Sequence, residues 1–295
     1  MVSSPFTPRE HAWPKKIWRG LTYNLHTYVL KRPDLTADIP WLSAALRASS
    51  EDMLARRLYK TAHYEPGVTD FLVRYLSSAP QDVIFDVGAN VGYYSVLAHK
   101  ICGDNVPVHA VEAERDNHRQ LLHNLKQNAA RSVVPHFCAI SDAPGALELY
   151  LWKRSNRGKH SLVPFEGADT VTVEAKTLAQ LYQEQQLEGR TISLLKIDIE
   201  GAEHRAFLGA GDVLSRCAVI TSEVSPKFLR RAGVDLDEHL QVVCDRGFTL
   251  FEIHDDKRVT PCSPEQLRDS PKGRNVAYVR DDLLRAPWAA ALLAG

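Results

Sequence analysis

Three carboxylates follow a short apolar run in the second half of the chain. Residues 195–197 lead into Asp198, Glu200 and Glu203, and Gly201 lies among them. A charged group at the end of a buried strand is costly unless it is paired or bound. Such carboxylates could hold a cation, position a substrate or accept a proton. The pattern therefore predicts a functional site at the end of this strand.

A second predicted strand, residues 83–87, also ends in an acid and then enters a glycine turn. Gly88, Asn90 and Gly92 follow Asp86, and glycines at such a turn allow the backbone to approach a ligand closely. A dinucleotide site would instead carry Gly-x-Gly-x-x-Gly and bind a pyrophosphate, which Asp86 would repel. A carboxylate suits the cationic amino group of S-adenosylmethionine. The turn therefore favours this cofactor over NAD.

Glu112 supplies the third part of the predicted cofactor site. It ends the next predicted strand, 24 residues after Gly88, which is close to the roughly 20-residue spacing at which an acid reaches a ribose diol. Its two oxygens could accept hydrogen bonds from both ribose hydroxyls. Taken singly, Asp86 could be a helix cap and Glu112 a surface carboxylate. Their joint spacing with the glycines favours cofactor binding.

The elements around these residues alternate between strands and helices. Apolar side chains at helical spacing predict helices over residues 117–128 and 237–246. Strands and helices in this order are typical of a doubly wound, Rossmann-like α/β domain with a mostly parallel sheet. Residues 146–152 and 171–175 interrupt the order and predict an antiparallel insertion. The predicted strands of the sheet cover residues 83–87, 107–111, 133–140, 193–197, 218–221, 249–253 and 276–279.

Residues 1–66 form a separate region ahead of a domain that we place at residues 67–295. The region contains three of the five tryptophans, Trp13, Trp18 and Trp41, and helix-like patterns near residues 41–60. We predict a helical N-terminal extension whose aromatic side chains pack onto the domain. A lid over the substrate and a face that touches a membrane are the alternatives.

The composition argues against several classes of protein. Lys plus Arg and Asp plus Glu number 36 each, so no overall positive field attracts nucleic acid. Five cysteines without a Cys-x-x-Cys pair argue against a disulfide framework and a zinc site. We find no run of ~18 apolar residues that could span a membrane, and we expect no signal peptide. We expect a cytoplasmic protein without a transmembrane segment. The sequence leaves open whether the chain forms homo-oligomers.

The motifs together resemble the FkbM-type S-adenosylmethionine-dependent methyltransferases. The resemblance covers residues 64–280, and it departs from the family at Ala113 and at residues 177–180, where the family carries a proline and Thr-Leu-Asp-Asp. It implies a seven-stranded class I methyltransferase fold and O-methylation of a hydroxyl on a small molecule or carbohydrate, such as a sugar, glycolipid or polyketide-like acceptor. It also implies that Ser141 and Asp142 contact the cofactor. The matching motifs are residues 85–94, Glu112, Asn124, residues 139–142 and residues 196–203.

Asp198 and Glu223 end predicted strands that are neighbours, so both should face one cleft beside the cofactor. Methyl transfer to an alcohol needs an acceptor oxygen held in line with the leaving group, and a base that takes its proton helps. We adopt a metal-free site in which Asp198 positions the acceptor, Glu200 shapes the loop and Glu203 begins the next helix. Mg²⁺ bound by Asp198 and Glu223 is the alternative.

Other polar residues have weaker claims to this site. His160, His204 and His254 are each expected at the surface or in packing, and not as the base. Lys196 lies inside a strand, where a buried charge needs an acidic partner. The basic residues between 153 and 161 could contact an acidic acceptor, although such runs are more often solvated loops.

Two other classes of function stay open. A nicotinamide-dependent oxidoreductase would bind NAD, and Asp86 with the missing third glycine opposes it. A non-catalytic module that binds S-adenosylmethionine would have a filled or closed cleft, and the intact carboxylates oppose it. RNA and protein methyltransferases share the fold, and zero net charge disfavours RNA.

Overall fold

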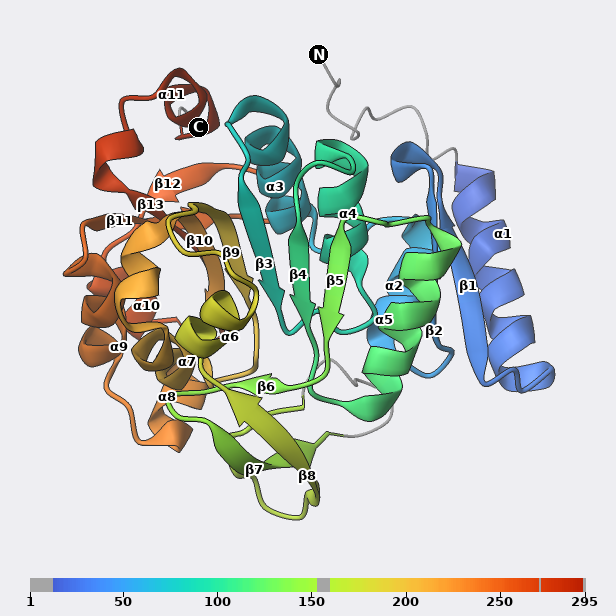
Figure 1. The fold of residues 1–295 in the computed structure, drawn as a ribbon. Coiled ribbons are helices and arrows are strands. Elements are labelled where there is room, and N and C mark those ends of the chain that lie inside the picture. Colours follow the sequence, from blue (N-terminus) through green and yellow to red (C-terminus); the bar gives the residue numbers. More distant parts are fainter. Residues whose placement is uncertain (1–12, 153–159, 271, 294–295) are drawn as a thin grey trace.

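The computed structural model describes residues 13–152, 160–270 and 272–293. Within them the main sheet has eight strands in the order β12-β11-β13-β10-β9-β3-β4-β5 (Figure 1). The winding reverses between β3 and β9, because the chain moves out to β4 and β5 and then returns to the other side. The predicted doubly wound α/β fold is confirmed. The strands are β3 (Val83–Val87), β4 (Val108–Val111), β5 (Val133–His136), β9 (Ile192–Ile197), β10 (Cys217–Val224), β11 (Phe248–Ile253), β12 (Val259–Pro261) and β13 (Arg274–Arg280).

The main sheet has one strand more than the seven expected, and the additional strand, β12, lies at its edge. β12 pairs antiparallel with β11 and covers only three residues. One buried valine followed by a terminal proline gives no alternating pattern, so the sequence could not predict this strand. β13 runs antiparallel between β10 and β11, so the sheet is mixed at this end.

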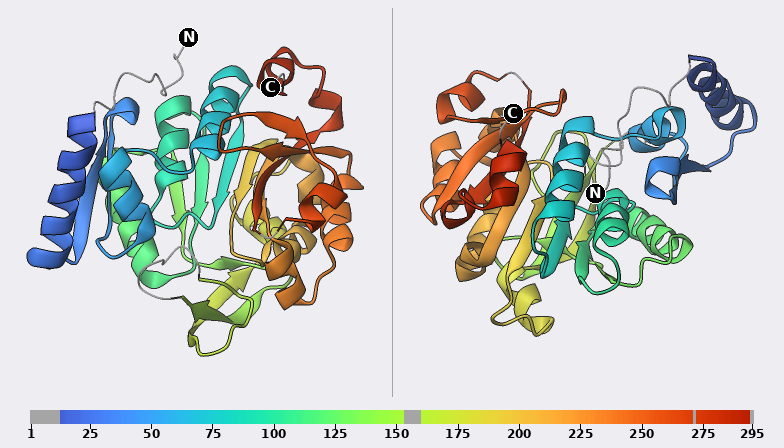
Figure 2. Two further views of the ribbon diagram at one scale, coloured as in Figure 1. Left: turned by 180° about the vertical axis from the view of Figure 1, so that it is seen from behind. Right: turned by 90° about the horizontal axis from the view of Figure 1, so that it is seen from above.

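Helices cover both faces of the sheet (Figures 1 and 2). Both faces of β3 are apolar: Ile84 joins the core on one side and Phe85 the core on the other, as expected for a strand buried between two helical layers. No helix among the described residues is long and apolar enough to cross a membrane. The first layer contains α3 (Pro66–Ser78), α4 (Tyr93–Cys102), α5 (Arg115–Gln127) and α11 (Pro287–Leu293), and the second α6 (Leu178–Glu184), α7 (Glu203–Ala210), α8 (Pro226–Ala232), α9 (Leu236–Cys244) and α10 (Pro264–Arg268).

The predicted antiparallel insertion is a small sheet of three strands. β7 (Gly145–Leu151) pairs antiparallel with β8 (Asp169–Lys176) over its whole length. β6 (Ala139–Ile140) lies on the other side of β8. The predicted strand over residues 133–140 is therefore two strands, one in each sheet. The basic residues 153–159 lie outside the described residues.

The N-terminal region contains a β-hairpin in addition to helices. α1 (Trp13–Asn24) continues into a π-helical turn, η2 (Leu25–Val29), and α2 (Met53–Thr61) follows the hairpin of β1 (Asp34–Ile39) and β2 (Ala44–Ser49). The predicted helix near residues 41–60 is thus wrong over β2. The side-chain amides of Asn124 on α5 and of Asn128, the residue that caps this helix, hydrogen-bond the backbone of Arg47 and Ala45. This tertiary pairing overrides the helical propensity of the local sequence.

The N-terminal region shares its core with the main domain. Leu46 of β2 and Leu58 of α2 belong to the same apolar cluster as residues of α3, α4 and α5, and Trp41 packs against it. The expected packing of the region onto the domain is confirmed for Trp41. Trp18 instead points outward. The domain boundary at residue 66 stays a prediction.

Candidate functional site

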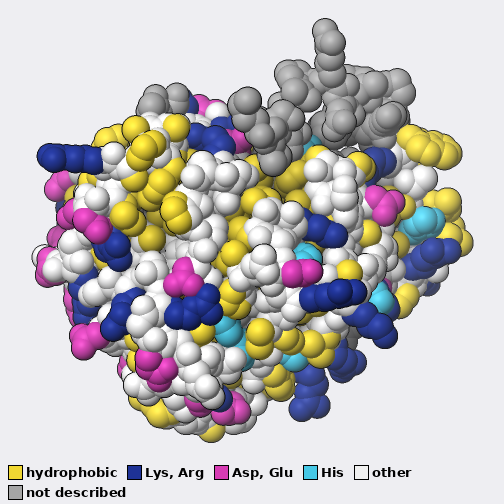
Figure 3. Space-filling model, turned by 45° about the horizontal axis from the view of Figure 1, so that its top comes forward, with side chains coloured by type: hydrophobic (Ala, Val, Ile, Leu, Met, Phe, Trp, Pro, Cys, Tyr) yellow, Lys and Arg dark blue, Asp and Glu magenta, His cyan; other side chains and the backbone are white. Residues whose placement is uncertain are grey.

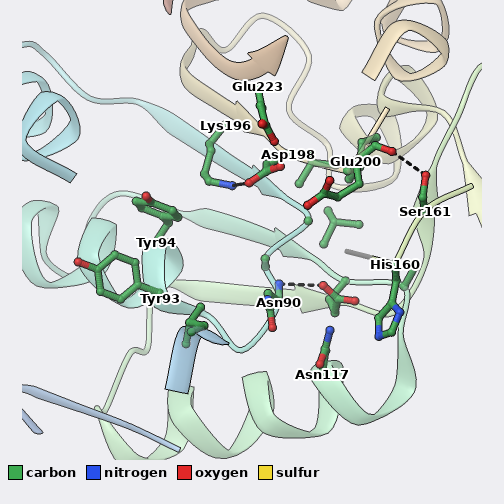
Figure 4. A pocket seen from close by; sticks show the side chains of 18 of the residues that line it. Asn90, Tyr93, Tyr94, Asn117, His160, Ser161, Lys196, Asp198, Glu200 and Glu223 are labelled. Carbon is green, nitrogen blue, oxygen red and sulfur yellow. Dashed lines mark hydrogen bonds and ion pairs between the residues drawn. The ribbon is translucent and has the colours of Figure 1, made fainter. Parts of the chain in front are cut away.

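A cavity of about 260 Å³ opens at the carboxyl ends of β3, β4, β9 and β10. Glu112 lines it on one side, Asp198 and Glu223 line it on the other, and Gly88 and Asn90 lie between them. These residues follow the strands on both sides of the point where the winding reverses. Ligands of open α/β sheets bind at this position. The structure thus brings six of the predicted site residues around one cavity, since Glu200 also lines it (Figure 4).

Gly88 occupies the point where the two halves of the sheet meet. Its φ of 79° suits glycine, and a Cβ here would clash with the carbonyl oxygen of Asp198. Asn90 also adopts a left-handed conformation, with φ of 51°. Gly92 serves helix packing instead, because a Cβ would overlap Leu121 of α5. Gly92 is not among the described residues that line the cavity.

Glu112 faces the cavity with part of its hydrogen-bonding capacity unused. One carboxylate oxygen accepts from the backbone N–H of Asn90 and the other from that of Glu114, both at 2.8 Å. Each oxygen keeps a further lone pair. Burial raises the pKa of Glu112 to about 7, although both N–H groups oppose this shift. The geometry fits a carboxylate that accepts from two vicinal hydroxyls.

Asp86 has a different environment from the one predicted. It is buried, it accepts a hydrogen bond from Ser95 at 2.6 Å, and it is not among the described residues that line the cavity. Asp86 and Lys196 are paired across β3 and β9, and the Lys196 ammonium lies 3.8 Å from Asp86 and 3.7 Å from Asp198. Burial raises the pKa of Asp86, and Lys196 only partly offsets it. Direct contact of Asp86 with a cofactor would need a rearrangement.

Lys196 has the acidic partners that the sequence required. Burial alone would lower the pKa of its ammonium, but Asp198 and Asp86 outweigh this effect and the pKa is raised. The ammonium also lies 4.9 Å from the ring centroid of Tyr94, a distance typical of a cation–π contact. A charged Lys196 therefore pairs with the buried Asp86 and with Asp198, which lines the cavity.

Three carboxylates converge on the β9 and β10 side of the cavity (Figure 4). Asp198, Glu200 and Glu223 each offer an oxygen within 4.8 Å of the others. Hard oxygen ligands at such distances could hold Mg²⁺ or bind hydroxyl groups of an acceptor. The carboxylates of Asp198 and Glu223 thus face the same cleft, as the strand order predicted.

The loop that carries Asp198 and Glu200 is held by Glu203, the first residue of α7. Its two carboxylate oxygens accept from the N–H groups of Ile199 at 2.8 Å and Gly201 at 2.9 Å. Burial raises its pKa to about 8, although backbone N–H donors oppose the shift. Ser161 also donates to the carbonyl of Glu200, which has φ of 54°. Glu203 is thus a structural residue of this site.

Glu65 is a site residue that the sequence analysis missed. It lines the cavity, has φ of 39°, and accepts a hydrogen bond from the Tyr94 hydroxyl at 2.6 Å. Burial and the nearby Asp198 raise its pKa, and the Tyr94 hydrogen bond opposes them. An acid directly before Pro66 at the start of a helix is the only sequence signal for it. Unusual backbone geometry at such a position often accompanies function.

The N-terminal region also contributes to the cavity wall. The cavity lining includes Met53, Leu54 and Arg57 of α2. In the sequence α2 comes before β3, and the whole of α3 lies between them. Arg57 is a cation in this largely acidic wall. Sequence spacing could not place these residues, because the contact depends on how the region packs against the domain.

Other predicted residues lie elsewhere. Ser141 donates to Asp142, and Asp142 pairs with Arg205 of α7. These two residues therefore link the small sheet to the second helical layer. Neither is among the described residues that line the cavity. Of the three histidines considered, only His160 lines the cavity. His204 lies near Glu238, and His254 bonds Thr260.

Comparison with known proteins gives one match to a family model. The model described as the methyltransferase FkbM domain matches residues 86–250, which is more than half of the chain. No curated protein matches this chain.

Several solved structures are similar at low identity. A methyltransferase FkbM from Methylobacillus flagellatus is 16% identical, with 67% of this chain and 43% of that chain covered and a TM-score of 0.42. A SAM-dependent O-methyltransferase from Thermotoga maritima is 11% identical, with coverages of 76% and 70% and a TM-score of 0.41. An Aeropyrum pernix fibrillarin with natively bound S-adenosylmethionine is 10% identical, with coverages of 68% and 66% and a TM-score of 0.36.

Proposed function

Because the chain belongs to the FkbM methyltransferase domain family, we propose that its cavity binds S-adenosylmethionine and that it methylates a hydroxyl oxygen of a small molecule or carbohydrate. The observation that carries the proposal is the division of one cavity into two sides at the reversal of the sheet. Glu112 lies on the β4 side, and the carboxylates of Asp198 and Glu223 lie on the β9 and β10 side. We place the activity in the cytoplasm, in keeping with five free cysteines.

The residues on the β4 side suit the adenosyl part of the cofactor. Glu112 keeps one lone pair on each oxygen for the ribose hydroxyls. Val111, Ile140 and Leu149 give the same side an apolar lining for a base. The backbone at Gly88 leaves room for close approach. We assign Asp86 a structural role next to the glycine turn, where it accepts a hydrogen bond from Ser95 and pairs with Lys196.

The residues on the β9 side suit the acceptor. When bound, S-adenosylmethionine supplies an electrophilic methyl group on a sulfonium. Asp198 or Glu223 would accept the hydrogen bond that the acceptor hydroxyl donates and so hold its oxygen in line with that methyl group. The proton that the hydroxyl loses would pass to one of the carboxylates. Glu65, whose pKa burial and Asp198 raise, is better matched to this proton than an ordinary carboxylate.

We propose that these carboxylates act without a metal. Lys196 already balances part of their charge, at 3.7 Å from Asp198. Mg²⁺ held by Asp198, Glu200 and Glu223 stays the alternative, since their oxygens lie within 4.8 Å of one another. Methyl transfer should therefore continue in the presence of EDTA. Activity that disappears with EDTA and returns with Mg²⁺ would establish the metal instead.

Ligand binding tests the cofactor directly. Calorimetric titration should show binding of S-adenosylmethionine and S-adenosylhomocysteine but not of NAD. Glu112→Ala should weaken both adenosyl ligands by at least about tenfold, since lost hydrogen bonds to a charged group contribute roughly 1.5–3 kcal/mol. Glu174→Ala removes an exposed carboxylate of β8 and serves as the control. Binding of NAD, or no binding at all, would overturn the methyltransferase assignment.

Cofactor affinity should also depend on pH through Glu112. Its pKa of about 7 in the free protein means that the ionised form, which accepts from both ribose hydroxyls, is depleted as pH falls below 7. Affinity for S-adenosylhomocysteine should therefore fall about tenfold between pH 8 and pH 6, because each unit below the pKa costs a factor of ten. Glu112→Gln should flatten this profile. An equal slope in wild type and variant would assign the titration to another group.

A further inference from the structure

The outward face of α1 and η2 is apolar. Its side chains recur three and four residues apart, so they share one side of the helix, and each is between 45% and 69% exposed. In Figure 3, yellow side chains gather at the edge of the molecule where this helix lies, with dark blue side chains beside them. We call this surface the α1 apolar face. It consists of Trp18, Leu21, Leu25, Tyr28 and Val29.

The opposite side of the helix is anchored by specific contacts. Tyr23 is buried and donates to the carbonyl of Ser50 at 2.6 Å, and Thr27 is buried beside it. Arg19 donates to the carbonyl groups of Tyr59 and Asp38. An ordinary surface helix turns its apolar stripe inward and its polar side outward. Here the anchored side is partly polar and the apolar side faces outward, which indicates an external partner.

Charge indicates the chemistry of that partner. Residues 13–32 contain five basic residues and no Asp or Glu. A second copy of the chain would bring two segments of this cationic composition together, and the exposed Lys31 and Arg32 of each copy would repel. Helices that lie in a bilayer interface combine Trp and Leu on one side with Lys and Arg nearby, and each basic residue adds attraction to anionic lipids. The basic residues are Lys15, Lys16, Arg19, Lys31 and Arg32.

We propose that the α1 apolar face binds the surface of a bilayer that contains anionic lipids. Trp18 and Tyr28 lie ten residues apart on this face, so aromatic rings that favour the headgroup region lie near both of its ends. The helix would lie in the plane of the interface, since among the described residues no helix could cross a membrane. This docking is independent of the cofactor and of the methyl acceptor.

Vesicle co-sedimentation of the full chain tests this proposal. The protein should bind vesicles of phosphatidylcholine mixed with phosphatidylglycerol, bind phosphatidylcholine alone much less, and detach as salt rises. The double variant Leu21→Asp with Leu25→Asp should lose at least about tenfold in vesicle affinity, because charged groups are costly to place among lipid tails. The matched control is Leu122→Asp with Leu208→Asp, two leucines that are 43% and 49% exposed elsewhere, and it should bind like wild type.

A second variant separates docking from folding. Lys31→Glu with Arg32→Glu changes only two exposed basic residues after η2 and should also weaken binding to the anionic vesicles. Absence of wild-type binding, or an equal loss in the control, would overturn the proposal. Analytical ultracentrifugation that shows a dimer which Leu21→Asp dissociates would assign the face to a second copy instead. Neither result depends on methyl transfer, so this proposal and the methyltransferase proposal can fail separately.

Discussion

Asp198→Asn should abolish most methyl transfer while the cofactor still binds. Turnover is expected to fall by about 10²–10⁴-fold, the range for loss of a group that positions or deprotonates a nucleophile. The amide keeps the shape of the side chain but cannot offer two anionic oxygens to the acceptor hydroxyl. The rate of methyl transfer should be followed with labelled S-adenosylmethionine and the acceptor that a screen identifies. Binding of S-adenosylhomocysteine should change by less than about threefold, since Glu112 lies on the other side of the cavity.

Two further variants make this result specific. Glu223→Gln should also lower turnover with cofactor binding retained, because its carboxylate lies in the same cluster. Asp212→Asn changes an exposed aspartate outside the cavity and should behave like wild type. Unchanged turnover in both cavity variants would refute the assignment of the transfer site, whatever the cofactor titration shows.

Lys196→Met should strongly destabilise the fold. It leaves the buried carboxylate of Asp86 without its cation, and breaking a buried ion pair on one side costs about 3–5 kcal/mol. The free energy of unfolding in urea at pH 7 should fall by this amount. Lys196→Met combined with Asp86→Asn should recover part of the loss, because no unpaired buried charge remains. A drop at pH 7 below about 1 kcal/mol would show that the pair contributes little.

The pH dependence of the Lys196→Met variant has a definite sign. The folded-state pKa of Asp86 already lies above its ordinary value, because burial raises it, and removal of the ammonium raises it further. A carboxyl group with a raised folded pKa binds its proton more tightly in the folded state, so its penalty appears as pH rises through that pKa. The difference in the free energy of unfolding between wild type and Lys196→Met should therefore become smaller as pH is lowered.

Sequence patterns predicted seven of the eight strands of the main sheet, because each of the seven contains an apolar run with a sharp end. β3 was predicted with its observed bounds, and Asp198 and Glu223 were expected in one cleft because their strands are neighbours. Asp86 was expected to face the cofactor, but it is not among the described residues that line the cavity. The position of a strand end alone does not say which way its last side chains point. In the structure Asp86 shares the Ile84 side of β3, where α4 and Ser95 cover it.

The remaining parts of the site depend on contacts between distant segments. Glu65 reaches the cavity because α3 packs beside α4, and Arg57 does so because the N-terminal region joins the core of the domain. The hairpin of β1 and β2 needs the amides of α5, about eighty residues away in the chain. Local propensity carries no information about such pairings. Ser141 and Asp142 match the family motif but are not among the described residues that line the cavity, so their contact with the cofactor stays a prediction.

The contacts of Glu203 bear on the entropy of ligand binding. This side chain ties both ends of the turn between Asp198 and Gly201 to the start of α7, and the left-handed residue Glu200 lies inside that turn. A turn fixed in this way loses its conformational freedom when the protein folds and not when a ligand arrives. Preorganised groups bind more tightly for the same contacts. Glu203→Ala should therefore weaken acceptor binding through added mobility of Asp198, although Glu203 itself would touch no ligand.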